Sequence, residues 1–230
     1  MMASSALTTL LDGTDAGSPA TLQVDVIADL ICPWCYLGKR RLDEALSAVR
    51  GPTAISWYPF QINPTMPQSG MALDEYFEKR FGNSDKLQTA LDDLKRIGAA
   101  AGINFNFDKL QRVPNTLDAH RLMKLAETEK ANPSGLAESI LRGFFADGLD
   151  LADRDVLIEI GDENGLSPTE IGKTLDNDLS RRIVLSQEAE VRRSGVVGVP
   201  DFLVNKRLLA VGAQSTEDLV GIFDRAMFGE

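Results

Sequence analysis

Both cysteines of this 230-residue chain lie in one short stretch, ADLICPWCYLGKRRL at residues 28–42, and this stretch constrains the fold more than any other. The alternating apolar residues at 22–29 predict a strand that leads directly into it. From Cys35 onward the apolar spacing predicts a helix ended by a Gly-Pro pair, and residues 55–62 predict a second strand. A strand, a helix and a strand in so short a segment predict a parallel β-α-β unit.

The middle of the chain changes to helical patterns, with no strand-like run before Gly198. Apolar residues three and four apart, bounded by Gly, Pro, Asn or Asp, predict helices at 73–81, 84–101, 116–130, 134–145, 154–163, 168–176 and 179–193. Short strands at 201–204 and 208–211 then predict a hairpin, and 216–227 predicts a closing helix. The predicted order is βαβ, a helical block, and ββα.

Charge and hydropathy exclude several classes of partner. The formal net charge of -10 would repel nucleic acid and anionic membrane surfaces. No apolar run approaches the roughly 18 residues that a membrane span needs, and residues 1–21 contain no Lys or Arg for a secretory signal. We therefore expect a cytoplasmic protein with no nucleic-acid or membrane partner and with residues 1–20 as a disordered tail.

Two thiols at positions i and i+3 of a helix start can join in a small ring, and Pro33 suits the first helical turn. Cys32 would lie at the helix N-terminus, where free backbone N–H groups and the helix dipole lower the pKa of a thiol. Cys35, one turn further in, would stay protonated until it resolves a mixed disulfide. The two cysteines thus have different predicted roles, attack and resolution.

Other interpretations of the cysteine pair fit less well. A zinc site needs two more Cys or His ligands, yet the chain has a single histidine, His120, far away in the helical block, so we expect no metal. Two buried structural cysteines would not need to flank Pro-Trp directly after a strand. A disulfide between two cysteines so close in sequence also cannot link distant segments of a fold. A redox pair is the favoured interpretation.

Five motifs together resemble a known family. These are DLICPWCYLGKRRL, WYPFQINP, NTLDAHRL, GVVGVPDFLVN and VGAQSTEDL, and they resemble the FrnE-type branch of the DsbA-like oxidoreductases in the thioredoxin superfamily. The family shares its fold with 2-hydroxychromene-2-carboxylate isomerases and kappa-class glutathione transferases. The resemblance implies an α/β thioredoxin fold at 21–66 and 179–230, interrupted by an all-helical insertion domain at 67–178.

The resemblance also implies roles for individual residues. Cys32 matches the family's nucleophile, Cys35 its resolving thiol and Pro200 its cis-proline, and the backbone of Val199 would pair with an extended substrate. Thiol or disulfide substrates follow, with no bound cofactor, glutathione as a candidate co-substrate, and a homodimer as a candidate assembly. DsbA itself has a His between its cysteines, whereas Trp34 adds no cation, which predicts an intermediate redox potential.

Further candidates surround this pair. Pro33 and Trp34 would form an exposed apolar contact surface for substrate. Asp25, or less favourably Asp29, is a candidate proton acceptor for Cys35. Residues Gln214, Ser215 and Thr216 are expected either to contact glutathione or only to cap the last helix.

Three more features have ordinary structural interpretations. The basic run at 39–41 is expected to be a solvated helix face. His120 is expected to be a structural hydrogen-bonding residue, although it lies in a family motif. Gln61 and Asn63 would line the cleft as polar contacts, although turn formation beside a proline explains Asn63 equally well.

These observations favour a thiol:disulfide oxidoreductase that uses the Cys32–Cys35 pair. The alternative enzyme is a glutathione-dependent isomerase or transferase, in which Cys35 would be idle. A third hypothesis is a chaperone-like binding module without redox chemistry, whose activity would survive loss of Cys32.

Overall fold

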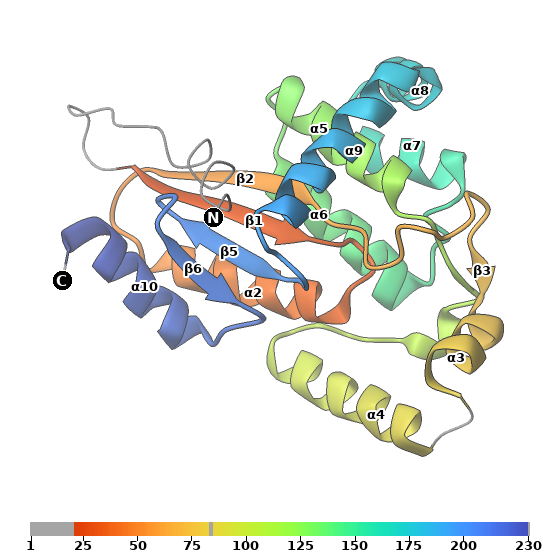
Figure 1. The fold of residues 1–230 in the computed structure, drawn as a ribbon, viewed down its shortest axis with the longest axis horizontal. Helices are drawn as coiled ribbons and strands as arrows, with labels where there is room; N and C mark the ends of the chain where they lie inside the picture. The colour runs from red at the N-terminus through yellow and green to blue at the C-terminus, as the bar shows by residue number, and fades with distance from the viewer. Residues whose placement is uncertain (1–20, 83–84, 230) are drawn as a thin grey trace.

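The computed structural model describes residues 21–82 and 85–229 of the chain. Within them, the main sheet has four strands in the order β2-β1-β5-β6. The strands are β1 (Leu22–Ala28), β2 (Thr53–Pro59), β5 (Asp201–Val204) and β6 (Leu208–Val211). As predicted, β1 and β2 are parallel, while β5 runs antiparallel to both β1 and β6. The sheet lies beside the helical block (Figure 1).

Helix α2 (Pro33–Ser47) connects β1 to β2 and packs together with α10 (Thr216–Phe228). The hairpin between β5 and β6 turns at Asn205 and Lys206, whose φ angles of 48° and 55° match a type I′ turn. The thioredoxin-type order βαβ…ββα is therefore confirmed, and the hairpin strands have the predicted bounds.

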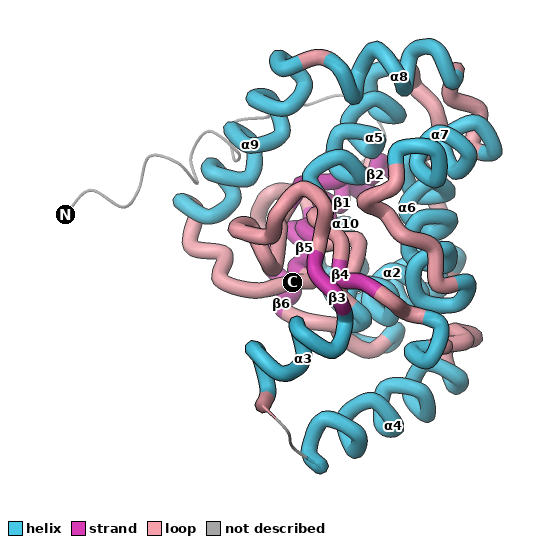
Figure 2. Tube along the Cα trace, turned by 90° about the vertical axis from the view of Figure 1, so that its right-hand side faces the viewer, coloured by secondary structure: helices cyan, strands magenta, loops and turns pink. Residues whose placement is uncertain are grey.

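The helical block follows the predicted pattern closely. Its helices are α3 (Leu73–Phe81), α4 (Asp85–Ala100), α5 (Leu117–Thr128), α6 (Pro133–Arg142), α7 (Arg154–Glu163), α8 (Pro168–Asp176) and α9 (Asp178–Arg193). Helices α5 to α8 form one group, and α3 and α4 lie apart from it in both views (Figures 1 and 2). The sheet lies between the two groups in Figure 2.

Two details of this block differ from the expectation. A small antiparallel sheet joins β3 (Met71–Ala72) to β4 (Arg112–Val113), so the insertion is helical but not entirely so. Strands of two residues are too short to leave an alternating pattern in the sequence. The predicted helix at 134–145 instead changes after Arg142 into a single π-helical turn, Gly143–Asp147, followed by the left-handed Gly148.

One continuous hydrophobic core joins the sheet, α2 and the helical block. Tyr36 on α2 makes an edge-to-face contact with Phe105 and stacks on Phe145, with ring centroids 5.9 Å and 6.2 Å away. These rings fix the start of α2 against the insertion. The predicted domain boundaries remain a prediction, but the two parts share buried side chains.

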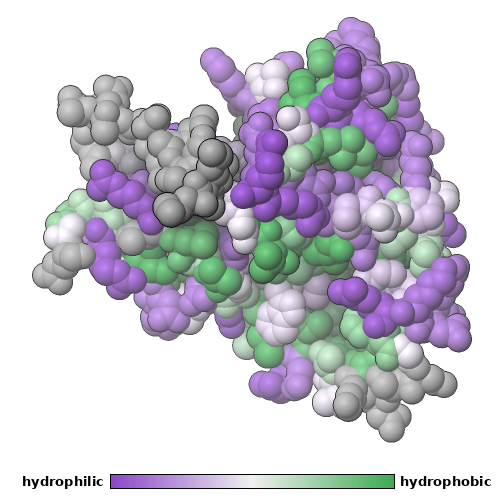
Figure 3. All heavy atoms as spheres, viewed as in Figure 1, coloured by the Kyte–Doolittle hydropathy of each residue, from purple (hydrophilic) through white to green (hydrophobic). Residues whose placement is uncertain are grey.

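The sheet face opposite α2 and α10 is partly open and apolar. Leu209 and Val211 on β6 are 53% and 61% exposed, and Figure 3 shows apolar side chains over β5 and β6. A groove of about 700 Å³ runs from this face to the loop that holds Val199 and Pro200. In the described parts of the chain, no helix is long and apolar enough to cross a membrane.

Candidate redox site

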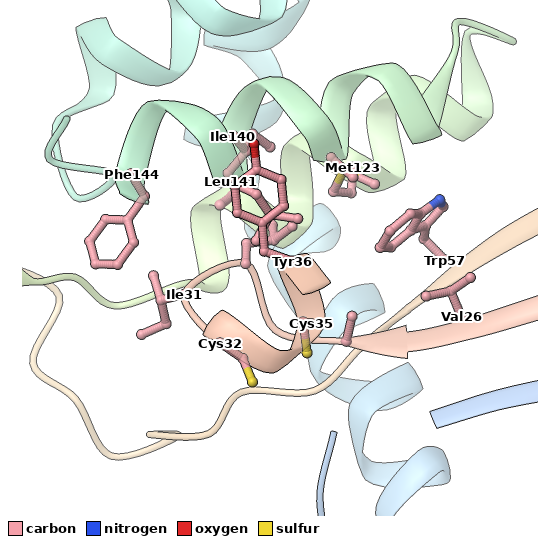
Figure 4. Close-up of a cluster of buried hydrophobic side chains, with 14 of the residues drawn as sticks. Val26, Ile31, Cys32, Cys35, Tyr36, Trp57, Met123, Ile140, Leu141 and Phe144 are labelled. Atoms are coloured by element: carbon pink, nitrogen blue, oxygen red, sulfur yellow. The ribbon is translucent and has the colours of Figure 1, made fainter. Parts of the chain in front are cut away.

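The two cysteines lie at the start of helix α2, directly after the loop that follows strand β1. Cys32 is the N-cap residue, Pro33 occupies the first helical turn, and Cys35 lies one turn further in. Proline fits this position because its missing N–H would have no helical partner. Figure 4 shows both sulfur atoms on the same side of α2, while Tyr36 points toward Ile140 and Leu141. Both cysteines are free thiols here.

Several donors lower the pKa of Cys32. The largest effect is a hydrogen bond from the Cys35 thiol, and the backbone N–H groups of Cys35 and Trp34 add to it. Burial and the negative charge of Asp29 act in the opposite direction but do not cancel these donors. The start of the helix therefore stabilises a thiolate on Cys32, as its sequence position predicts.

Cys35 has the opposite behaviour. Burial raises the pKa of its thiol well above the ordinary value, and the hydrogen bond to Cys32 and the charges of Cys32 and Asp29 raise it further. Its side chain is 2% exposed, against 6% for Cys32. The pair thus consists of one stabilised thiolate and one thiol that holds its proton.

The loop before β5 closes the site from the other side of the fold. The peptide bond between Val199 and Pro200 is cis. Cys32 Sγ lies 3.8 Å from the Val199 carbonyl oxygen, to which it donates when protonated, although the two residues are 167 positions apart. Gly38 of α2 allows the close approach, since a Cβ atom there would lie 2.9 Å from Pro200 Cγ. No local pattern in the sequence marks Gly38 for this role, because the loop that it contacts is far away in the chain.

Pro33 and Trp34 are at the surface beside the pair. Pro33 is partly buried, and Trp34 is 45% exposed, which agrees with the predicted solvent-facing position. Ile62 is exposed as well, at 36%. Whether these residues contact substrate remains a prediction.

The structure separates the two candidate carboxylates. Asp25 is on β1 and lines the groove over the sheet together with Tyr58 and Lys206. Burial raises the pKa of Asp25, and one of its oxygens is buried without a hydrogen bond. Asp29, not Asp25, is next to the cysteines, because its backbone N–H donates to Cys35 Sγ at 3.5 Å.

Asp29 also contacts His120, which lies far away in sequence. The carboxylate is fully buried and accepts hydrogen bonds from the backbone N–H groups of Leu30 and Ile62, at 2.8 Å and 2.7 Å. His120 Nε2 lies 3.5 Å from Asp29 Oδ1. Its burial and this contact fit the expected structural position, and they also bring it toward the redox pair.

Residues 214–216 stabilise the start of α10. The Ser215 hydroxyl accepts from the Asp218 N–H, Thr216 donates to Glu44 at 2.7 Å, and Gln214 donates to the Val211 carbonyl. Acidic residues occupy the first turn of the helix. These contacts favour the capping interpretation, and contact with glutathione remains a prediction.

The expectation of a solvated basic face at 39–41 is wrong. Lys39 is 5% exposed and binds Asp43 and Glu138, and Arg40 binds Glu138 at 2.6 Å. Arg41 instead donates to the backbone carbonyls of residues 213 and 214. The three basic side chains therefore form ion pairs and hydrogen bonds with other parts of the fold, and we assign them no role in stabilising the Cys32 thiolate. Glu138, on helix α6, gave no signal in the sequence.

The polar residues after β2 also have partners. Gln61 is buried, and its backbone and side-chain N–H groups donate to Glu188 on α9, so it does not line an open cleft as expected. Arg192 binds the same Glu188 at 2.6 Å. Asn63 accepts from the Tyr76 hydroxyl and lines a pocket of about 190 Å³. In the described residues, no three His, Cys, Asp or Glu side chains are grouped as metal ligands.

Comparisons with known proteins agree with this geometry. The model of the DSBA-like thioredoxin domain matches residues 23–224. YwbO of Bacillus subtilis is 22% identical over 91% of this chain and 98% of its own. A probable DsbA oxidoreductase of Streptomyces coelicolor is 27% identical, with a TM-score of 0.81 over 89% of each chain.

A third relative is similar in fold. The cytosolic disulfide reductase DsbM of Pseudomonas aeruginosa, solved with GSH, is 21% identical, with a TM-score of 0.61 over 89% of this chain and 95% of that one. The family model, the fold and the position of the cysteine pair lead to one conclusion. This chain belongs to the DSBA-like thioredoxin domain family.

Proposed function

We propose that this protein is a thiol:disulfide oxidoreductase in which Cys32 attacks and Cys35 resolves. The observation that carries the proposal is the difference between the two thiols. The pKa of Cys32 is lowered and that of Cys35 is raised, although they are three residues apart. A thiolate is the attacking species in disulfide exchange, and a buried protonated thiol cannot compete with it.

The exchange proceeds through a mixed disulfide. The Cys32 thiolate attacks one sulfur of a substrate disulfide, the substrate S–S bond breaks, and the second substrate sulfur leaves as a thiolate. Cys35 then loses its proton and attacks Cys32, which forms the Cys32–Cys35 disulfide and releases the first substrate sulfur. The reverse sequence oxidises a dithiol substrate.

We assign the substrate surface to the residues around Cys32. An extended peptide would pair with the backbone of Val199, and Pro33 and Trp34 would contact its side chains. Support comes from the Val199 carbonyl, which lies 3.8 Å from Cys32 Sγ, and from the exposed indole of Trp34. Glutathione is a candidate co-substrate, since the DsbM structure contains GSH.

The proposal is tested by trapping. After incubation with oxidised glutathione, the reduced full-length protein with Cys35→Ser should hold one glutathione in a mixed disulfide on Cys32, with the second glutathione released as a thiol. The adduct is detected as a mass increase on the intact chain that a reductant removes. Cys32→Ser should hold none. An isomerase or transferase activity that survives Cys35→Ser, without any trapped adduct, would favour the glutathione-dependent alternative.

The direction of electron flow needs a second measurement. Equilibration of the Cys32–Cys35 pair with defined glutathione ratios gives its reduction potential. A potential near that of thioredoxin would make the protein a reductant, and one near that of DsbA would make it an oxidant. The intermediate value predicted from Trp34, the cytoplasmic location and the FrnE-type branch remain predictions.

A further inference from the structure

Resolution of the mixed disulfide leaves a chemical problem at Cys35. Its thiol is buried and holds its proton tightly, yet the thiolate is the form that must attack Cys32. Water has little access to a side chain that is 2% exposed. A group inside the protein must therefore take up this proton.

Asp29 is the candidate acceptor, since its backbone N–H donates to Cys35 Sγ at 3.5 Å and its charge acts on the Cys35 thiol. A proton placed on its carboxylate has no direct route to solvent. Its carboxylate is fully buried, and both oxygens already accept backbone hydrogen bonds. Among the Lys, Arg and His side chains of the described residues, His120 is the one within 4.0 Å of this carboxylate. His120 Nε2 is buried and has no hydrogen-bond partner within bonding distance. An unpartnered buried ring nitrogen that faces a carboxylate needs an explanation.

His120 also reaches a second space. It lines a small pocket with a volume of about 10 Å³, close to the volume that one water probe occupies. The pocket walls include Tyr58 on β2, Lys124 on α5 and Gln187 on α9. The Lys124 side chain is 34% exposed, so this pocket lies near the surface. The His120 ring therefore lies between the buried Asp29 carboxylate and the small pocket near the surface.

We propose that His120 carries the proton of Cys35 between the Asp29 carboxylate and solvent. This inference rests on the proposed function. When Cys35 attacks the mixed disulfide, its proton moves to Asp29 Oδ1 and then to His120 Nε2, and the opposite ring nitrogen, Nδ1, releases a proton toward the small pocket. The Cys32–Cys35 bond forms, the bond from Cys32 to substrate breaks, and the departing substrate thiolate takes a proton from solvent.

The relay requires His120 to carry its proton on Nδ1 in the resting state, so that the Nε2 lone pair faces Asp29. Of the charged or titratable groups, Asp29 lies 3.5 Å from Nε2, and Tyr58 and Lys124 share the walls of the small pocket with the ring. Lys124 is itself paired with Glu127 at 2.9 Å. His120 acts through Asp29 and does not touch the reacting sulfur atoms. It is therefore a positioning and relay residue.

The experiment follows two successive thiol releases from dithiobis(nitrobenzoate). The reduced wild-type protein should release one coloured thiol when Cys32 attacks and a second when Cys35 resolves, whereas Cys35→Ser should release only the first. His120→Gln should leave the first release within about twofold and slow the second roughly tenfold. Asp29→Asn should slow the second release roughly 100-fold, as loss of a general base does.

The pH profile separates a relay from a purely structural role. In His120→Gln and Asp29→Asn, the second release should climb with pH across a range where the wild-type rate is flat, because hydroxide must then remove the proton. His120→Gln keeps a polar side chain of similar reach, so it carries the test if Asp29→Asn does not fold. A second release with the wild-type rate and pH profile in His120→Gln would overturn the relay. Absence of the first release in wild type would instead contradict the proposed function.

Discussion

On one side of the cysteine pair, Cys32 lies against the Val199 carbonyl and beside the exposed indole of Trp34. On the other side, Cys35 lies against the backbone of Asp29, whose buried carboxylate faces His120. The first side consists of backbone groups and apolar surface, and the second of buried titratable groups. Under the proposed function, substrate contact and proton transfer would therefore belong to different parts of the fold, which meet at the two sulfur atoms.

The largest effect should come from replacing either thiol. Cys32→Ser should lower turnover of a disulfide substrate by at least roughly 1,000-fold, since a hydroxyl cannot replace a thiolate here. Cys35→Ser should also stop turnover but retain one round of attack. Stopped-flow absorbance and intact mass report both steps. If Cys32→Ser and Cys35→Ser carried out a single round of attack equally well, the two thiols would be interchangeable. That result would contradict separate attacking and resolving roles.

The second prediction concerns Gly38, which lets α2 approach the Val199–Pro200 loop. Gly38→Ala should destabilise the fold by about 1–3 kcal/mol, because its Cβ would lie 2.9 Å from Pro200 Cγ and 3.0 Å from Phe202 Cζ. The matched control is Gly221→Ala on α10, where the nearest atom is 3.7 Å away. That change should stabilise the helix by roughly 0.5–1 kcal/mol. Denaturant unfolding measures the free energy of unfolding of both variants. Equal changes in that free energy would contradict a close contact between α2 and the Val199–Pro200 loop at Gly38.

Glu138 links the cysteine helix to the insertion, so its replacement should have a smaller effect on stability. Burial alone would raise the pKa of Glu138, but hydrogen bonds from Lys39 and Tyr36 and the charges of Lys39 and Arg40 lower it overall. Glu138→Gln should cost roughly 1–2 kcal/mol near neutral pH. The exposed Glu163→Gln on α7 is the control.

The pH dependence of this difference has a defined sign. A carboxylate whose pKa is lowered by folding stabilises the native state above its unfolded pKa, and this contribution is lost as pH falls through the folded value. The stability gap between wild type and Glu138→Gln should therefore shrink in acid. A gap that widens as pH falls would exclude the ion-pair explanation.

The smallest effect is expected at the substrate surface. Trp34→Ala should raise the KM for a protein substrate roughly fivefold, which corresponds to about 1 kcal/mol of lost binding. Turnover of a small aromatic disulfide should stay nearly unchanged. Phe228→Ala, an exposed apolar residue at the end of α10, serves as the control. Identical losses for both kinds of substrate would place Trp34 in the chemistry and not in substrate contact.

Local patterns predicted much of the fold. Helices α3, α7 and α8 and both hairpin strands have the predicted bounds, because Gly, Pro, Asn and Asp mark their ends. Strands β3 and β4 were missed, since two residues are too short for a periodic signal. The placement of Cys32 at the helix start was equally local, and the structure has it there.

The buried side of the site depended on contacts between distant segments. Asp29 and His120 are 91 positions apart, and no local pattern pairs them. For the same reason Lys39 seemed solvated, because its partner Glu138 is on a helix of the insertion. The sequence favours Asp25 over Asp29 because an acid at the end of a strand is usually solvated. The groups that cover Asp29, at residues 62 and 120, come from distant segments.

The titration of Cys32 tests the central claim most directly. Thiolate absorbance in the ultraviolet is followed against pH in the reduced protein. Wild type gives the pKa of Cys32 with its largest hydrogen-bond donor, the Cys35 thiol, and Cys35→Ala gives it without that donor. We expect Cys32 to titrate below an ordinary thiol in wild type and to move upward in Cys35→Ala. A wild-type Cys32 that titrates at or above the ordinary value, or one unaffected by Cys35→Ala, would contradict the division into an attacking and a resolving thiol.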